Sequence, residues 1–385
     1  MSSSHDPKPG PKAVVVAITV VAATYAYFLL FAQFGFLRAL QLAANGEQEV
    51  IKHVFGLMGI AGISGSIFAA SVFTPSRAPG TLMVGFCGCA LAAGAVATGV
   101  PGKYFYLVSL VIGLGVGVVT VTLAGLLRAA AGTDRLGWAI GCGTGVAYAF
   151  CNLPMIFNAV PATQAWASLV IAAVGAVAAS KLKGRAMGNE SVGFDYSRRG
   201  IAVWTVAFFA LVSLDSGAFY VIQNTPEIKG QTWTGEWRLE IIAIAHLGAA
   251  MFAGLAFDRG WMGRTIALAA MLLVMACALV CFFLRWAELG AWLYASAVSA
   301  YSVGLVFYAS GSSRPSTAAV VYAIAGWAGS AVGIGLTASL HSLPAWFVAA
   351  AGVVMAAMLS LRWIFSRGPL PSGNRVIGKP PAFNR

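Results

Sequence analysis

The sequence predicts an all-α integral membrane protein with twelve transmembrane helices arranged as two six-helix bundles. Of the 385 residues, 59% are hydrophobic and only 9% are charged, and the mean hydropathy is +0.82. A soluble chain carries about 25% charged residues, so a water-soluble fold is excluded. The apolar residues also gather into stretches of about 20, the length that crosses a hydrocarbon core. The charged residues stand mostly in the short breaks between these stretches.

Twelve such stretches follow one another along the chain. Each must be helical, because backbone groups in hydrocarbon need hydrogen-bond partners within the same segment. We expect spans at 13–33, 51–73, 81–98, 104–128, 136–158, 163–182, 200–222, 237–257, 264–285, 289–310, 315–338 and 343–366. No interval between them is long enough to hold a separate soluble domain.

The longest polar stretch between spans divides them into six and six. It follows the sixth span and carries five basic residues between Lys181 and Gly200. The last residues are rich in Pro, Gly and basic side chains without periodicity, a composition typical of disorder. The sequence therefore predicts a tail at 1–12, a first bundle at 13–182, a linker at 183–199, a second bundle at 200–366 and a disordered tail at 367–385.

The basic residues predict that both termini and the linker are cytoplasmic. With twelve spans and a cytoplasmic N-terminus, only six of the 24 Lys and Arg residues fall outside, namely Arg38, Lys52, Lys103, Lys229, Arg238 and Arg285. This bias follows the positive-inside rule, so the net charge of +12 needs no nucleic-acid partner. The first apolar run is longer than a signal-peptide core, and we expect it to be retained. The expected location is a bacterial inner membrane.

Positions about 184 residues apart carry similar features, which predicts two parallel repeats. In the fifth and eleventh spans, for example, Gly141 to Gly145 corresponds to Gly329 to Gly333. Two parallel sets of six helices joined by a cytoplasmic linker resemble the major facilitator superfamily over residues 13–366.

A loop after the eighth span gives a more specific resemblance. Residues 254–264 are similar to that superfamily's Gly-x-x-x-Asp-Arg-x-Gly-Arg loop, with two extra residues between Arg259 and Gly263. The counterpart after the second span keeps Arg77 but has no Asp. The resemblance implies that Asp258, Arg259, Arg264 and Arg77 form a cytoplasmic gate.

Asp215 is the first candidate site residue. A charge near the bilayer centre costs about 2.5 to 3.5 kcal/mol on insertion scales, and Asp215 lies in the outer third of the seventh span. Four polar residues near it recur at spacings of three and four and so share one helix face: Ser213, Ser216, Tyr220 and Gln223. We expect this face to line water or substrate. The alternative is that Asp215 pairs with a cation at the outer rim, such as Arg238 or Lys52.

His246 lies near the middle of the eighth span, with Met251 just over one turn further on. A neutral histidine bonded within a helix interface is one interpretation. A proton relay with Asp215 is a second, and a soft-metal site of His246 and Met251 is a third. The six cysteines all fall within spans, so we expect no disulfide framework. Cys277 and Cys281 share a helix face, which would suit a soft metal. Cysteines are, however, also ordinary lipid-facing or core residues of membrane helices.

No Lys or Arg stands in the middle of any span. Members of the superfamily that carry phosphate esters use mid-membrane arginines, so the resemblance disfavours that class of substrate. Aromatic and amide side chains in the expected cavity helices suit a neutral or cationic solute: Tyr25, Tyr27, Gln33, Tyr148, Asn152, Tyr301, Tyr322 and Trp327.

The sequence has no hydrolase, zinc-protease or nucleotide-binding motif, so we expect neither an enzyme nor a cofactor. We expect a monomeric secondary transporter that moves a small neutral or cationic solute by alternating access, coupled to protons. Two alternatives stay open. One is an importer of copper or another soft metal, and the other is a transport-inactive subunit or assembly factor of a membrane complex. The missing Asp beside Arg77 keeps the second alternative open.

Overall fold

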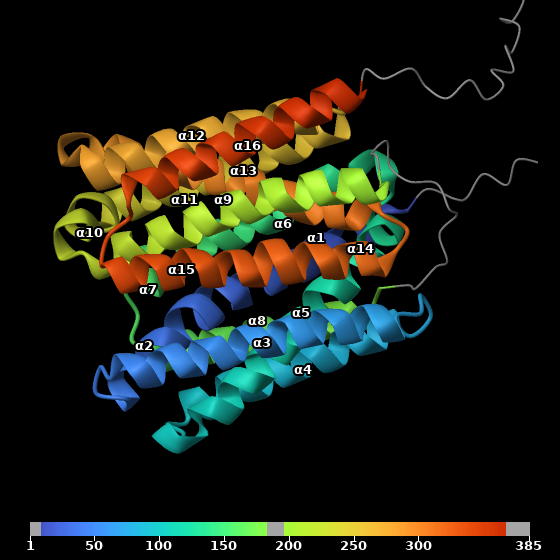
Figure 1. Ribbon diagram of the computed structural model, residues 1–385. Coiled ribbons are helices and arrows are strands. Elements are labelled where there is room, and N and C mark those ends of the chain that lie inside the picture. The colour runs from blue at the N-terminus through green and yellow to red at the C-terminus, as the bar shows by residue number, and fades with distance from the viewer. Residues whose placement is uncertain (1–8, 183–195, 367–385) are drawn as a thin grey trace, which may run out of the picture.

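The computed structural model describes residues 9–182 and 196–366, with side chains as far as Leu361 (Figure 1). All regular elements in these ranges are helices. The first half contains α1 (Pro11–Tyr27), the π-helix η1 (Phe28–Gly35), α2 (Phe36–Ala43), α3 (Gln48–Val72), α4 (Ala78–Ala97), η2 (Gly102–Tyr104), α5 (Phe105–Ala131), η3 (Thr133–Arg135), α6 (Leu136–Cys151), α7 (Pro154–Phe157) and α8 (Pro161–Ala179).

The second half is helical in the same way over its described part. It contains α9 (Arg198–Asn224), α10 (Pro226–Thr232), α11 (Glu236–Asp258), α12 (Met262–Phe282), η4 (Leu284–Trp286), α13 (Ala287–Gly311), α14 (Pro315–Val320), the π-helix η5 (Val321–Ala328), α15 (Gly329–Leu340) and α16 (Ala345–Ser366).

These elements group into twelve spanning segments. Within residues 9–182 and 196–366, ten helices are long and apolar enough to cross a membrane. The fifth segment is shorter, because Leu153 precedes Pro154 and is extended at ψ 132°, which separates α6 from α7. The twelfth is apolar over Ala345–Leu361. The predicted all-α fold is confirmed for the described residues, whereas the predicted linker at 183–195 and tails at 1–8 and 367–385 lie outside them.

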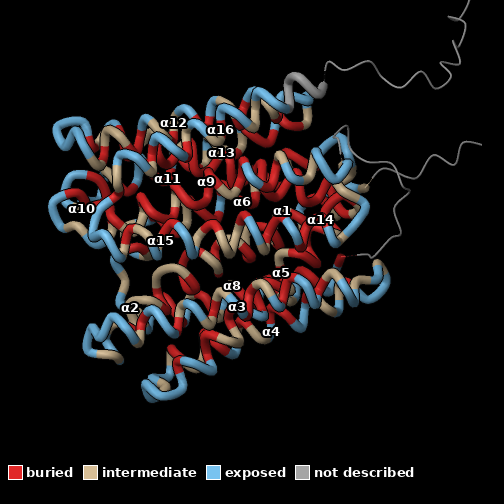
Figure 2. Tube along the Cα trace, viewed as in Figure 1, coloured by how far each residue is buried: buried red, intermediate tan, exposed pale blue. Residues whose placement is uncertain are grey.

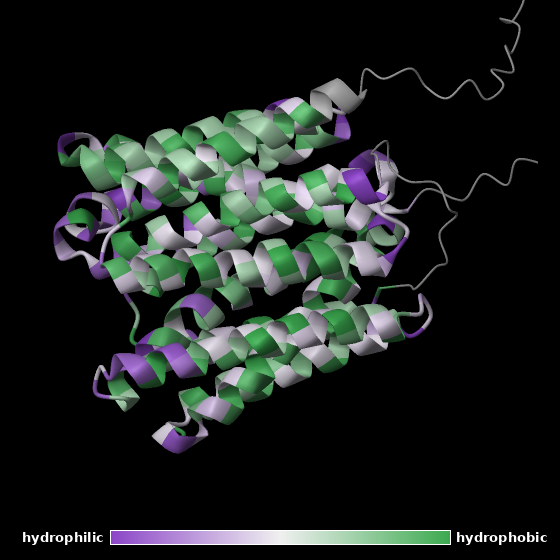
Figure 3. Ribbon diagram, viewed as in Figure 1, coloured by the Kyte–Doolittle hydropathy of each residue, from purple (hydrophilic) through white to green (hydrophobic). Residues whose placement is uncertain are grey.

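The surface of the helices is apolar along most of their length. Hydrophilic residues lie mainly at the two ends of the molecule (Figure 3). Buried residues fill the interior, while the outer faces of peripheral helices such as α4, α12 and α16 are exposed (Figure 2). Large apolar side chains are among the exposed ones, with Leu91 exposed by 74% and Val353 by 69%. Such a surface is stable in lipid rather than in water, so the chain is an integral membrane protein.

Glycines allow the helices of the first bundle to pack closely. A Cβ atom on Gly113 of α5 would overlap the backbone oxygen of Met58 in α3, and one on Gly117 would overlap that of Gly62. Close backbone approach through small residues is typical of helix pairs in membranes, where packing rather than hydrophobicity drives association.

Several helix pairs join the bundles: α6 packs on α11, α3 packs on α14 and η5, and α13 packs on α5 and α6. In the first pair, a Cβ atom on Gly141 would lie 3.1 Å from the Cα atom of Gly254. The glycines that the offset of about 184 residues aligns with this motif behave differently, since Gly329 and Gly333 pack on α9 within their own bundle. The sequence repeat therefore aligns two motifs that make different contacts.

Candidate functional site

The carboxylate of Asp215 is held between α9 and α13. One carboxylate oxygen accepts a hydrogen bond from the Tyr294 hydroxyl and the other accepts one from the Tyr301 hydroxyl. The Tyr294 hydroxyl also lies 3.0 Å from the backbone oxygen of Asp215. Because the two tyrosines are seven residues apart, they share one face of α13. We call Asp215, Tyr294 and Tyr301 the carboxylate clamp.

The clamp contains no ion pair among the described residues. The two rim cations considered as partners of Asp215 are engaged elsewhere: Arg238 lies 3.6 Å from Glu288, and Lys52 lies 2.9 Å from Glu49. Tyr148 of α6 and Cys277 of α12 are the further titratable groups close enough to interact electrostatically with Asp215.

The same helix α13 also bonds two buried polar side chains of neighbouring helices, His246 and Tyr148. His246 of α11 is 3% exposed, and its Nδ1 lies 2.7 Å from the Ser299 hydroxyl. Its ring stacks on Tyr148, with centroids 4.5 Å apart. The Tyr148 hydroxyl lies 3.0 Å from the Ser302 hydroxyl. His246 and Asp215 are thus both tied to α13 but share no hydrogen bond.

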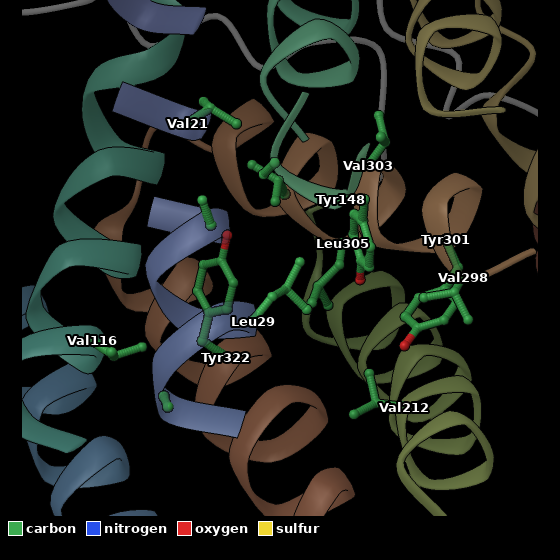
Figure 4. Close-up of a cluster of buried hydrophobic side chains, with 14 of the residues drawn as sticks. Val21, Leu29, Val116, Tyr148, Val212, Val298, Tyr301, Val303, Leu305 and Tyr322 are labelled. Carbon is green, nitrogen blue, oxygen red and sulfur yellow. The ribbon is translucent and has the colours of Figure 1, made fainter. Parts of the chain in front are cut away.

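Aromatic and aliphatic side chains from both bundles surround these groups. Figure 4 shows Tyr148 of α6 near Tyr301 of α13, with Tyr322 of η5 in the same cluster. Tyr25 of α1 lies 6.3 Å from Tyr148, measured between ring centroids, and its hydroxyl donates to the backbone oxygen of Ser302 at 3.5 Å. The predicted residues Tyr25, Tyr148, Tyr301 and Tyr322 therefore meet at the contact between the bundles.

The predicted polar face of α9 is arranged differently from the expectation. Ser216 hydrogen-bonds with Ser330 of α15 at 3.0 Å, and Ser213 is buried against Gly333. Both serines therefore face α15 within the second bundle, while Asp215 faces α13. Tyr220 and Gln223 are partly exposed near the outer end of α9.

The first segment also corrects the expectation that all its polar residues line one cavity. Tyr27 is buried within the first bundle, where its hydroxyl donates to the backbone oxygen of Cys89 at 2.9 Å. It is two residues from Tyr25, and residues so spaced point to nearly opposite faces of a helix. Gln33 is partly exposed in η1.

Asn152 joins the two bundles near the end that we predict to face outward. Its amide nitrogen donates to the backbone oxygen of Tyr148 at 2.9 Å, and its oxygen accepts from the Trp233 indole at 3.3 Å. Nearby, Phe34 of η1 meets Phe219 of α9 edge-on, with centroids 5.0 Å apart. We call these contacts the outer seam.

At the end that we predict to be cytoplasmic, the predicted gate residues are not all brought together. Asp258 accepts hydrogen bonds from the backbone nitrogens of Gly137 and Trp138 in the other bundle. Arg77, Arg259 and Arg264 are exposed. One hydrogen-bonded contact between the bundles here thus joins the Asp258 carboxylate to the start of α6.

The residues proposed for a soft metal do not form a donor cluster. No group of three or more His, Cys, Asp or Glu side chains is suited to a metal ion within the part of the chain that is described. His246 is bonded to Ser299, and Met251 is five residues further along α11, which places it on another face. The interpretation of His246 as a histidine bonded in a helix interface fits this geometry.

Four residues of the site were not anticipated from the sequence: Tyr294, Ser299, Ser302 and Trp233. Tyr294 is seven residues before Tyr301, a spacing that could have identified it as a second residue on the same face. The serines and Trp233 gave no signal, because Ser is common in membrane helices and Trp is common near their ends.

Comparison with known proteins identifies the fold. Neither a protein-family model nor a curated protein sequence matches the chain. Solved structures do match. The crystal structure of the human organic anion transporter MFSD10 (TETRAN) is similar with 16% identity and a TM-score of 0.59, covering 92% of this chain and 98% of that chain. The proton:xylose symporter XylE bound to 6-bromo-6-deoxy-D-glucose is similar with 12% identity and a TM-score of 0.69, covering 92% and 95%. This chain therefore has the twelve-helix fold of the major facilitator superfamily.

Proposed function

We propose that this protein is a secondary active transporter that moves a small neutral or cationic solute by alternating access, coupled to protons through Asp215. The observation that carries the proposal is the carboxylate clamp: an acidic group within a span, held by two tyrosine hydroxyls and by no described cation. Placing an acidic group at this depth in the membrane costs free energy. A function in which Asp215 gains and loses a proton during transport would explain why the chain has it there.

Protonation of Asp215 would rearrange the clamp. The ionised carboxylate accepts a hydrogen bond at each oxygen, whereas the protonated form carries a hydrogen on one oxygen and must donate it. The tyrosine at the protonated oxygen would then accept that hydrogen or donate a weaker bond, so the present arrangement would change. Because both tyrosines belong to α13, binding or release of a proton would alter how α13 lies against α9.

The surroundings of Asp215 favour a neutral or cationic solute. The faces of Tyr25, Tyr148 and Tyr301 attract cations, and their hydroxyls offer hydrogen bonds to a neutral molecule. XylE is a symporter of protons and xylose, so a proton-coupled solute is compatible with this fold. The proposed transporter acts as a monomer in the bilayer.

Alternating access requires that the bundles separate at one end at a time. In the described state they are in contact at both ends, through Trp233 and Asn152 on one side and Asp258 and Gly137 on the other. The first contact is a small set of hydrogen bonds and ring contacts, and the second has two hydrogen bonds beside the packing of α6 on α11. These hydrogen bonds cost little to break, since a single hydrogen bond contributes about 0.5 to 1.5 kcal/mol net.

The variant Asp215→Asn tests the proposal. A thermal-shift screen of sugars, amines and quaternary ammonium compounds on the purified protein first finds a solute, because a ligand of the folded state raises the melting temperature. Uptake of that solute into proteoliposomes is then measured with and without an imposed pH gradient. We expect Asp215→Asn to lose accumulation driven by the gradient but to keep exchange of solute.

A matched control is Glu240→Gln, which removes an exposed carboxylate of α11 and should leave accumulation intact. Full accumulation by Asp215→Asn would remove Asp215 from the coupling mechanism. If no solute binds and the protein purifies with a membrane complex instead, the role of a transport-inactive subunit replaces the proposal.

A further inference from the structure

Trp233 is a buried tryptophan in the connection between two spans. It directly follows α10 at the outer end of the second bundle, and its side chain is only 2% exposed. Other tryptophans at this end are far more open to their surroundings, such as Trp346 at 61% exposed. A loop tryptophan at the end of a membrane helix usually lies in the interfacial belt, so burial of Trp233 requires another explanation.

The indole of Trp233 crosses from the second bundle to the first. Its Nε1 donates to the side-chain oxygen of Asn152 at 3.3 Å. Asn152 is fixed in turn, because its amide nitrogen donates to the last turn of α6 at the backbone oxygen of Tyr148. The same outer connection contributes Lys229, whose ammonium lies 5.9 Å from the ring centroid of Phe157 in the first bundle.

The ring of Trp233 also contacts the carboxylate clamp. It meets Tyr294 edge-on, with centroids 5.7 Å apart and an angle of 88°. It meets Phe219 in the same way at 6.2 Å, and Phe219 contacts Phe34 of the first bundle at 5.0 Å. Tyr294 is therefore in contact with Asp215 through its hydroxyl and with Trp233 through its ring.

We propose that Trp233 is the latch of the outer gate and that Tyr294 links its closure to the state of Asp215. This inference rests on the proposed function, and it assigns a positioning role to a residue outside the clamp. While Asp215 accepts from Tyr294, the tyrosine ring is held where the indole can pack on it and reach Asn152. Loss of that acceptor leaves the Tyr294 hydroxyl with only the backbone oxygen of Asp215, so the ring is held less firmly and supports the indole less.

The gate is measured as a distance across the outer seam, without any solute. Spin labels are placed on cysteines introduced at Val160 in the first bundle and Glu227 in the second, which are both exposed. The six native cysteines are replaced by alanine or serine in this background. Distance distributions in nanodiscs then give the fractions of closed and open outer seam.

Three variants test the latch. Trp233→Phe keeps a ring but removes the indole N–H, and we expect the ratio of open to closed outer seam to rise about fivefold, the effect of one lost hydrogen bond. Asn152→Ala should give a similar rise, and the double variant should add little to either single variant. The matched control Trp346→Phe should leave the distribution unchanged.

The link to Asp215 is tested in the same labelled protein. Asp215→Asn should open the outer seam, because the amide offers one acceptor oxygen in place of two, for which Tyr294 and Tyr301 must compete. In a Tyr294→Phe background the same substitution should have no further effect, since the hydroxyl that reports on Asp215 is absent.

The outcomes separate the latch from the transport proposal. Unchanged distances in both Trp233→Phe and Asn152→Ala, in protein with an unaltered melting temperature, would overturn the latch. If Asp215→Asn then still abolishes coupling, the proposed function survives without it. If Trp233→Phe does not fold, Asn152→Ala decides the question alone. A response to Asp215→Asn that persists in Tyr294→Phe would overturn the role of Tyr294.

Discussion

The carboxylate of Asp258 in α11 lies 2.6 Å from the backbone nitrogen of Gly137 in α6, across the boundary between the two bundles. Its second oxygen lies 2.8 Å from the backbone nitrogen of Trp138. The first N–H groups of a helix have no partner within the helix, and its N-terminus is the positive end of the helix dipole. The second bundle thus supplies the N-terminal cap of a helix in the first.

Removal of this cap should open the end that we predict to be cytoplasmic. We expect Asp258→Ala to shift the equilibrium toward the open inner side by about 1 kcal/mol, the usual value of a helix cap. Spin labels at Ser76 and Ser313, which are exposed at this end, would report the distance. Arg259→Gln should have a smaller effect. An equal effect of both variants would show that the arginine carries the contact as much as the cap does.

The close approach of α6 and α11 should depend on the absence of a side chain at Gly141. In Gly141→Ala the new methyl group would lie 2.5 Å from the backbone oxygen of Ala250, so the helices must move apart. We expect a loss of about 1 to 3 kcal/mol, as is typical of overpacking, seen as a lower melting temperature. Gly248→Ala is the matched control in α11, because nothing lies within 4 Å of its Cβ position. Equal melting temperatures for the two variants would contradict the packing of this seam.

The partner of His246 should matter for stability. Ser299→Ala would leave the buried Nδ1 of His246 without its hydrogen bond, at a cost of about 1 to 3 kcal/mol. Ser296→Ala in the same helix removes only a bond to the backbone oxygen of Trp292 and should cost less. Thermal unfolding of both variants in detergent measures the difference. If addition of copper raised the melting temperature of the wild type but not of His246→Ala, the soft-metal alternative would be revived.

The orientation predicted from the basic residues can be tested at two described positions. Ser76 follows the second span and Thr98 ends the third, and both are exposed. In a background without native cysteines, Thr98→Cys should react with a membrane-impermeant thiol reagent added to intact cells. Ser76→Cys should react only after the membrane is opened. The reverse pattern would place the termini outside.

The sequence predicts the helices and the acidic centre because both depend on the cost of placing groups in hydrocarbon. Apolar stretches in hydrocarbon must be helical. Asp215 is identified as a candidate because a charged side chain within a membrane span costs free energy. Tyr301 was expected on the same grounds as a side chain of a central helix, but its bond with Asp215 was not. That bond depends on the rotation of α9 and α13 about their own axes. The sequence indicates this rotation only weakly, because both helices are apolar on most of their faces.

The facing of individual side chains was the least predictable property. Tyr27 contacts Cys89, and Ser216 contacts Ser330. Neither contact can be predicted from the sequence, because the helices are apolar on all faces and their pattern does not show which face meets which neighbour. The break after Asn152 follows from Pro154, yet the bond between Asn152 and Trp233 joins residues from different bundles. Periodicity describes one helix at a time, so it carries no information about such pairs.

The π-helix η1, at Phe28–Gly35, determines where in the first span the fold tolerates the deletion of one residue. A π-helical turn holds more residues than an α-helical turn, so one codon could be lost here and the segment could relax to an α-helix. The helix would stay continuous and apolar, and the residues beyond the deletion would keep their orientation, because the wider π-helical turn is what accommodates the extra residue. A deletion in the α-helical part that precedes it, Pro11–Tyr27, would instead rotate every residue beyond it by about 100° about the helix axis. Phe34 would then turn away from Phe219, so within this one span the two places for a deletion differ in their effect on the alignment of the bundles.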